Sequence, residues 1–110
     1  MPSYSKNEVI LVRYPFSDAS SAKIRPAVVA SAAHTSRDLF IVPLTSRTAS
    51  LLKGEFVLAD WRTAGLNVES AVKRGLYTIH DRLVIKSIGE LSLADSEQLK
   101  RALQEWLDLD

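Results

Sequence analysis

The sequence predicts a mainly β domain, a small barrel or sandwich, that ends in one α-helix. Seven short apolar runs of strand type follow one another between residues 8 and 88, and polar or turn-forming segments separate them. Several short strands with turns between them are typical of an all-β barrel or sandwich and not of repeated βα units. After residue 90 the apolar residues take up the spacing of a helix instead.

The predicted strands cover residues 8–14, 25–31, 38–44, 54–60, 69–72, 75–80 and 82–88. Ser92 and Asp95, three residues apart, form a capping box that opens the C-terminal helix. One face of this helix should pack against the sheet, because its apolar residues recur at helical spacing. These are Leu99, Ala102, Leu103, Trp106 and Leu107, and we expect Trp106 to belong to the core.

Composition indicates one soluble globular domain over residues 1–110. The chain is 46% hydrophobic and 25% charged, which is ordinary for such a domain. The absence of cysteine excludes disulfides and cysteine-based zinc sites. Residues 1–8 lack the apolar core of a secretory signal, and no apolar run approaches the roughly 18 residues of a membrane span. We therefore expect a cytoplasmic protein. Because no metal-ligand spacing and no phosphate-binding glycine loop is present, we expect no metal and no cofactor.

Charge is divided unevenly along the chain. Residues 1–89 contain 12 Lys and Arg against 7 Asp and Glu, a net charge of +5, whereas residues 90–110 contain 2 against 6, a net charge of −4. A basic body with an acidic end fits a moderately anionic ligand, and a single nucleic-acid strand fits it better than a long duplex. A solvated surface of mixed charge is the alternative.

The stretch around Arg25 and Pro26 suggests where such a ligand would bind. Proline cannot donate to a β-ladder, so we expect Pro26 at a strand start or edge, with Arg25 facing a loop at the strand entrance. Thr45 and Ser46 follow the buried run at 38–44. If the two strands pair antiparallel, the arginine and the hydroxyls share one rim. Guanidinium and hydroxyl groups are suited to binding phosphate.

Several blocks in a fixed order resemble the MazF/PemK family of toxin endoribonucleases from toxin–antitoxin modules. The blocks are EVILVRYPFSD, KIRPAVVAS, DLFIVPLTS, GEFVLAD, a loop containing AGL, SAVKRGLYTIHDRLVIKSIGELS and a short C-terminal helix. RPAVV and PLTS are the most specific, and the resemblance covers nearly the whole chain. It implies an SH3-like β-barrel that acts as a homodimer. It also implies metal-independent cleavage of single-stranded RNA, including mRNA, and neutralisation by a cognate antitoxin.

The resemblance also assigns residues. It places Arg25 at the family's catalytic arginine and Thr45 at its hydroxyl position, with Ser46 beside it. Residues 17–23, which include Lys23, match the family's flexible loop that lies over the RNA-binding groove. The chain departs from the family where many members carry an acidic residue, because residues 73–75 read Lys-Arg-Gly. Asn7 also replaces a usual glycine. Either another group moves the proton or the activity is weakened.

The chemistry of metal-free RNA cleavage fits Arg25 and Thr45 in different roles. Guanidinium hardly deprotonates, so Arg25 cannot be the base, but it can stabilise the charge on the phosphorane. Thr45 can donate a hydrogen bond to the same phosphate. The structural alternatives are a salt bridge at a strand end for Arg25 and a loop-capping hydroxyl for Thr45.

The remaining candidates have weaker support. Histidine titrates near neutral pH, which suits His80 for acid–base work, although a histidine before an aspartate at a turn can equally be structural. Tyr14 and Phe16 could stack RNA bases, with Phe16 otherwise in the barrel core. The basic candidates for contacts to the RNA backbone are Lys73, Arg74 and Arg82, each of which could instead lie on a solvated face.

The leading hypothesis is therefore a toxin endoribonuclease. The missing carboxylate supports an alternative, a catalytically inactive SH3-like module that binds RNA or protein. A third possibility is a scaffold for a partner other than RNA, because fold alone does not fix function.

Overall fold

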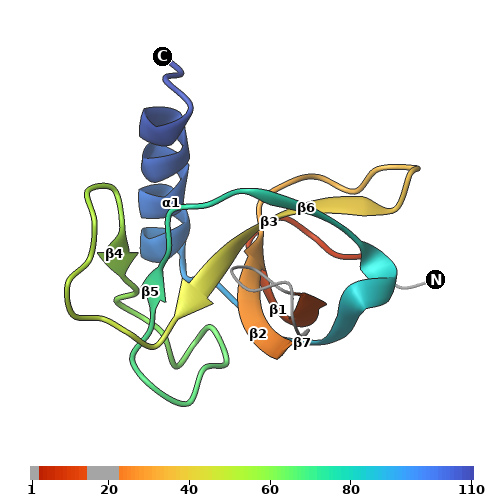
Figure 1. The fold of residues 1–110 in the computed structure, drawn as a ribbon, viewed down its shortest axis with the longest axis horizontal. Helices are drawn as coiled ribbons and strands as arrows, with labels where there is room; N and C mark the ends of the chain where they lie inside the picture. Colours follow the sequence, from red (N-terminus) through yellow and green to blue (C-terminus); the bar gives the residue numbers. More distant parts are fainter. Residues whose placement is uncertain (1–2, 15–22) are drawn as a thin grey trace.

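Three antiparallel strands, β1 (Glu8–Tyr14), β2 (Lys23–Val29) and β3 (Asp38–Thr45), form the centre of the fold. The computed structural model describes residues 3–14 and 23–110 (Figure 1). The other elements are β4 (Phe56–Val57), β5 (Ala71–Val72), β6 (Tyr77–His80), the 3-10 turn η1 (Asp81–Leu83), β7 (Val84–Glu90) and α1 (Leu93–Trp106). The prediction of a mainly β domain with a C-terminal helix is confirmed.

The strands make one seven-stranded sheet in the order β4-β5-β3-β2-β1-β7, in which β6 also pairs with β3. All of the ladders are antiparallel. Strands β1, β2, β3, β6 and β7 curl into a ring, beside which stand α1, β4 and β5 (Figure 1). Among the described residues no ladder joins β6 to β7, and η1 spans the gap. The predicted barrel is therefore open.

The central strands are buried on both faces. Successive side chains of a strand point to opposite faces, so each strand contributes to two cores. One core fills the inside of the curl and contains Ile10, Val12, Ala27, Val29, Leu39, Ile41 and Ile79. The other lies under α1 and includes Val9, Val28, Val42, Leu44, Leu58 and Leu99. This double burial explains why the central strands read as continuous apolar runs without alternation.

Helix α1 begins and packs largely as its sequence predicts. The Ser92 hydroxyl accepts a hydrogen bond from the Asp95 N–H at 3.2 Å. Leu99 and Ala102 are buried, and Leu103 and Trp106 pack partly buried against the core. The prediction was wrong for Leu107, which is 49% exposed, because the helix ends at Trp106. No helix in the described part of the chain is long and apolar enough to cross a bilayer.

Asp95 also has a role that its capping position did not predict. Its side chain is 1% exposed, and its two oxygens each accept a backbone N–H at 2.9 Å, from Ala59 and Asp60. Asp95 thus ties α1 to the chain after β4. The strand predicted at 54–60 shortens to β4, because the Glu55 N–H donates within the preceding turn to Leu52 O and the Ala59 and Asp60 N–H groups bind Asp95.

A bulge shortens the strand predicted at 75–80. Ile41 pairs with Tyr77 and Leu44 pairs with Val72, so three steps along β3 face five steps along the partner chain. Residues 73–76 therefore lie outside the strands, and β6 begins at Tyr77; the strand predicted at 69–72 ends as predicted but begins at Ala71. The last strand begins later than predicted because η1 takes up residues 81–83.

Of the two positions predicted for Pro26, a strand start or an edge, the first is wrong, and the residue lies where β2 pairs with β1 alone. It is the fourth residue of β2, which lies between β1 and β3. The ladder between β2 and β3 begins one residue later, at Ala27. The N–H that Pro26 lacks is therefore not needed by that ladder.

Candidate active site

Arg25 lies in β2 where the strand emerges from the core. Its Cα pairs with that of Val12 in β1, and its side chain is exposed. Alternation along the strand puts Arg25 on the same face as Ala27 and Val29, which belong to the core inside the curl. Lys23, two residues earlier and also exposed, shares this face. The strand predicted to begin at Arg25 therefore begins two residues earlier, and its exposed first residues include the cations Lys23 and Arg25.

Thr45 is the last residue of β3 and lies at the same end of the sheet. Alternation puts it on the face of Leu39 and Ile41, which belong to the same inner core. The β2–β3 ladder ends at Ala27 and Pro43, two residues before Arg25 in β2 and two residues before Thr45 in β3. The two residues that the sequence singled out therefore follow the same end of this ladder, where Thr45 pairs with Ala71 of β5.

The Thr45 hydroxyl has a structural partner. Its Oγ1 accepts a hydrogen bond from the Arg47 N–H at 3.1 Å, as in a turn closed by a threonine. This interaction uses one lone pair and leaves the O–H proton to donate. Loop capping and a contact to phosphate are therefore compatible at Thr45. Ser46 follows it as an exposed residue at the start of the loop.

Lys73 and Arg74 lie near this end in the bulge after β5. Ala71 pairs with Thr45, and the Lys73 N–H donates to Pro43 O at 3.0 Å. Both basic side chains are exposed. Four of the predicted cations therefore come from two segments near this end of β3: Lys23 and Arg25 from β2, and Lys73 and Arg74 from the bulge after β5.

The carboxylate of Glu55, which was not among the predicted site residues, also lies in this region. Residues 73–75 contain none, but the Glu55 Oε2 accepts a hydrogen bond from the Arg74 N–H at 2.9 Å. The Thr48 hydroxyl donates to Glu69 Oε1 at 3.3 Å. The loop after Thr45 is thus fastened to the chain on both sides of β5. No sequence signal identified these pairings, because each joins residues about 20 positions apart.

His80 and Arg82 lie at the opposite end of β3. His80 pairs with Asp38, seven residues along β3 from Thr45, which corresponds to about 23 Å of extended strand. The His80 Nδ1 accepts the Arg82 N–H at 3.1 Å and caps η1. The structure therefore does not bring these two residues to Arg25 and Thr45.

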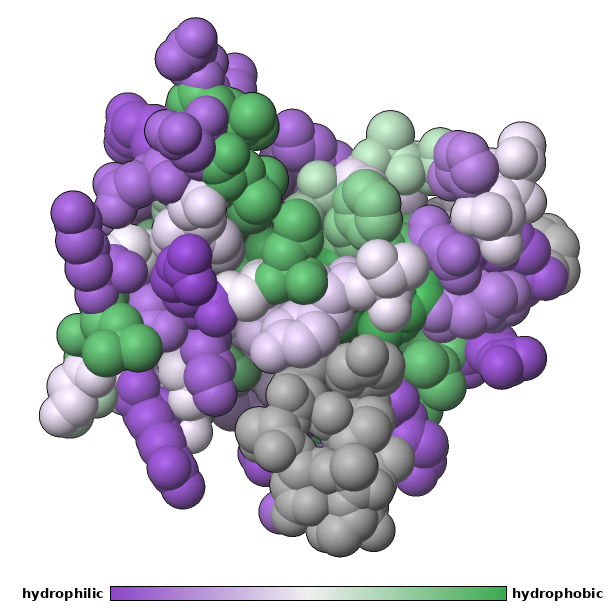
Figure 2. Space-filling view, turned by 45° about the horizontal axis from the view of Figure 1, so that its top comes forward, coloured by the Kyte–Doolittle hydropathy of each residue, from purple (hydrophilic) through white to green (hydrophobic). Residues whose placement is uncertain are grey.

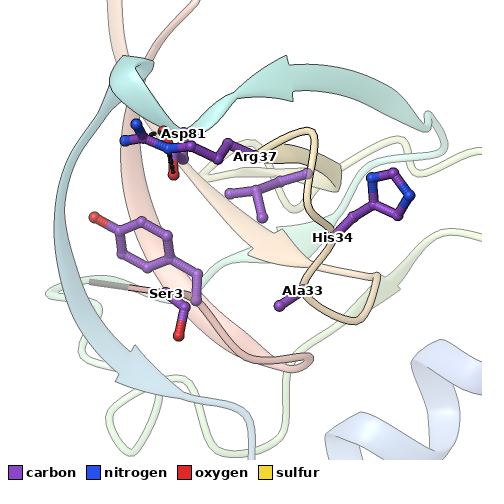
Figure 3. Close-up of a pocket in the computed structure, with 7 residues that line it drawn as sticks. Ser3, Ala33, His34, Arg37 and Asp81 are labelled. Atoms are coloured by element: carbon purple, nitrogen blue, oxygen red, sulfur yellow. Dashed lines mark hydrogen bonds and ion pairs between the residues drawn. The ribbon is translucent and has the colours of Figure 1, made fainter. Parts of the chain in front are cut away.

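A cavity of about 120 Å³ lies at that opposite end (Figure 3). Arg37 forms a two-pronged ion pair there with Asp81, with Nε–Oδ2 and Nη2–Oδ1 distances of 2.9 Å each. Tyr4 and Leu39 contribute apolar walls. In Figure 3 the ring of His34 points away from the Arg37–Asp81 pair. The cavity is separate from the end of β3 that carries Thr45.

Some predicted residues lie outside the described part of the chain. These are Phe16 and residues 17–22 of the loop, and for Tyr14 only the backbone in β1 is described. Within the described ranges, no three histidine or acidic side chains come together in a way that could hold a metal ion.

Solved structures of the same fold include several toxins. The chain is 20% identical to the Mycobacterium tuberculosis toxin MazF-mt6, covering 94% of this chain and 98% of that one with a TM-score of 0.73. MazF in a MazE–MazF structure from Deinococcus radiodurans is 15% identical, with coverages of 97% and 98% and a TM-score of 0.77. An endoribonuclease from a mycobacterial species, solved with its cognate antitoxin, is 18% identical, with coverages of 98% and a TM-score of 0.74.

No curated protein matches the sequence significantly. The likeness to the solved structures establishes the fold, and the sequence itself establishes the family. The family model for PemK-like, MazF-like toxins of type II toxin–antitoxin systems matches residues 5–107, and the chain therefore belongs to this family.

Proposed function

We propose that this protein is a toxin that acts as a metal-independent endoribonuclease on single-stranded RNA, including mRNA, in the cytoplasm. The observation that supports the proposal is the antiparallel ladder of β2 and β3, which ends at Ala27 and Pro43, two residues short of both Arg25 and Thr45. The family match and the solved relatives named as endoribonucleases support the same activity.

The proposed reaction is an internal transesterification. The 2′-oxygen loses its proton and forms a bond to the adjacent phosphorus, and the bond to the 5′-oxygen breaks as that oxygen gains a proton. The products are a 2′,3′-cyclic phosphate, or the 3′-phosphate formed from it, and a 5′-hydroxyl. Arg25 stabilises the charge on the phosphoryl oxygens, and Thr45 donates a hydrogen bond to one of them. Removing one such donor typically raises the barrier by about 3 kcal/mol.

The other candidates take supporting roles. Lys23, Lys73 and Arg74 would contact phosphates on either side of the cleaved bond. Ser46 would assist Thr45 as a second hydroxyl. Tyr14 and Phe16 would stack on bases, and Arg82 would be reached only by an RNA that extends along β3. The proposal assigns no proton transfer to His80, because that residue pairs with Asp38 at the far end of the strand.

We also propose a homodimer and a cognate antitoxin as partners. Large apolar side chains are exposed on the described surface, among them Phe40 at 49%, Leu76 at 41% and Leu107 at 49%. Figure 2 shows a band of apolar surface that runs from the C-terminal end of the chain toward the middle of one face. Apolar surface of this kind is typical of protein–protein contact sites.

The direct test is incubation of the purified protein with single-stranded RNAs of varied sequence in EDTA, followed by mapping of the new ends. We expect 5′-hydroxyl and cyclic or 3′-phosphate ends from the wild type and strongly reduced cleavage by Arg25→Ala. Absence of cleavage by the wild type, or equal cleavage by both proteins, would contradict the proposal.

A second candidate function is a binding module without catalysis. It is favoured by residues 73–75, which contain no carboxylate, and by Glu55, whose two oxygens are already bonded to backbone N–H groups. RNA binding without turnover, retained in Arg25→Ala, would select this function.

A further inference from the structure

Glu55 closes a tight turn at the entrance to β4. Its Oε1 accepts the Leu52 N–H at 2.7 Å, and its own N–H donates to Leu52 O at 3.0 Å. Gly54 has a φ of +88°, a conformation that the third position of such a turn reserves for glycine. A Cβ at Gly54 would overlap the Trp106 indole, so α1 packs directly on the turn. Glu55 is therefore held in place by two reciprocal hydrogen bonds and by the helix.

The second carboxylate oxygen joins this turn to the basic bulge. The last ladder pair between β4 and β5 is Phe56 with Val72, and Glu55 is the next residue. Its Oε2 accepts the Arg74 N–H at 2.9 Å, so the side chain continues the connection where the backbone ladder stops. On the other side the Lys73 N–H donates to Pro43 O in β3. Two consecutive amides are thus held by β3 and by Glu55, and both basic side chains project to solvent.

We infer that Glu55 is a positioning residue of the candidate active site. Its carboxylate fixes the backbone of Lys73 and Arg74 against the loop that follows Thr45, and so sets where the two cations meet RNA. Each carboxylate oxygen holds one backbone donor, and we assign Glu55 a role through these hydrogen bonds and no proton transfer. The inference rests on the proposed function, since it concerns how that site grips its substrate.

A substitution that removes the Glu55 charge distinguishes this role from that of a solvated carboxylate, because the two roles predict opposite changes in RNA affinity. A negative charge beside a site for an anionic ligand repels the ligand, so removal of an idle carboxylate should strengthen RNA binding. Removal of a positioning carboxylate should weaken binding instead, because the cations lose their fixed place. Glutamine retains only one acceptor oxygen, so Glu55→Gln must lose one of the two backbone bonds.

The experiment compares Glu55→Gln and Glu55→Asp with Glu90→Gln. Glu90 is an exposed residue at the end of β7, so its substitution makes the same change in net charge away from the bulge. We expect both Glu55 variants to lose roughly ten-fold in kcat/KM on single-stranded RNA, because small displacements of binding groups are costly. The loss should appear mainly in KM, and the Arg74 amide should exchange faster with solvent. Glu90→Gln should behave as the wild type.

The possible outcomes separate this inference from the proposed function. Wild-type cleavage together with unchanged or faster cleavage by Glu55→Gln overturns the inference and leaves the nuclease assignment intact. If Glu55→Gln does not fold, Glu55→Asp decides, since it keeps the charge but shortens the side chain, and wild-type KM in that variant overturns the inference. A wild-type protein that cleaves no RNA overturns the proposed function and this inference with it.

Discussion

An arginine lies near each end of β3, and the two arginines differ in whether a carboxylate binds their side chain. At one end Arg37 forms a two-pronged ion pair with Asp81, whose side chain is 11% exposed. At the other end the side chain of Arg25, whose backbone pairs with Val12, forms no hydrogen bond or ion pair with any residue in the described ranges. The structural alternative considered for Arg25, a strand-end salt bridge, is thus observed at Arg37. An arginine whose fork is filled by a carboxylate stabilises the fold, whereas one without such a partner can bind an anion.

The capping groups at the two ends differ in the same way. The His80 Nδ1 and the Thr45 Oγ1 each accept a backbone N–H two residues later, both at 3.1 Å. A hydroxyl that accepts in this way still has a proton to donate, and Thr45 ends β3 two residues past its last pair with β2. His80 pairs with Asp38, and its Nδ1 lies 3.4 Å from the Asp81 Oδ1 that Arg37 already binds. Position along β3, more than residue type, separates the candidate catalytic end from the structural end.

The largest expected effect is at the two arginines. Arg25→Ala should slow RNA cleavage by roughly 100-fold or more, about 3 kcal/mol of barrier, with little loss of stability. Arg37→Ala should instead leave the cleavage rate nearly unchanged and lower the free energy of unfolding by about 1–2 kcal/mol, because the Asp81 carboxylate loses its partner. Cleavage kinetics and urea unfolding of both variants would measure the two effects. Arg25→Lys, which keeps the charge but not the two-pronged guanidinium, is the control. Equal losses of activity in the Arg25 and Arg37 variants would contradict the assignment of a catalytic role to one arginine and a structural role to the other.

The contrast between the two ends also shows what a sequence can predict. The Ser92–Asp95 cap lies within three residues, so a local pattern identified it. Strand ends and antiparallel pairing predicted Arg25 and Thr45 on one rim, and of these two premises the structure confirms the antiparallel pairing of β2 with β3. The carboxylates of Asp95 and Glu55 bind amides 36 and 19 residues away, and no local pattern encodes such pairs. The bulge at 73–76 was missed for the same reason, because only the pairing with β3 defines it.

The next effect in size concerns the Thr45 hydroxyl. Thr45→Val keeps the shape but removes both the donor and the cap on the Arg47 N–H. Because a neutral hydroxyl donates a weaker hydrogen bond to phosphate than a guanidinium does, we expect a smaller effect than at Arg25, a fall of about ten-fold in cleavage. Thr45→Ser restores the hydroxyl and should recover most of the rate. Single-turnover cleavage of one defined RNA would measure both. A Val variant as active as the wild type would reduce Thr45 to a loop cap.

A third prediction concerns the outer face of β3 at its Asp38 end. Phe40 is 49% exposed there, and we propose that this end serves assembly. Phe40→Glu should therefore shift the proposed dimer toward monomer, because it places a charge in an apolar contact. Light scattering across a concentration series would measure the shift. Leu93→Glu, at a residue 77% exposed at the start of α1, is the matched control. A Phe40→Glu protein that dimerises like this control would exclude Phe40 from the interface.

The smallest effect is expected at His80. Its Nδ1 caps η1, so His80→Ala should lower the free energy of unfolding by about 0.5–1 kcal/mol, as the loss of other helix caps does. His80→Asn, which can accept the same N–H, should restore part of that stability. Neither variant should change cleavage by more than about two-fold, because the residue lies about 23 Å along β3 from Thr45. A large rate loss in His80→Ala with normal stability would mean that the two ends of β3 act together on RNA, either along one extended strand of RNA or through a second copy that brings its His80 to this site.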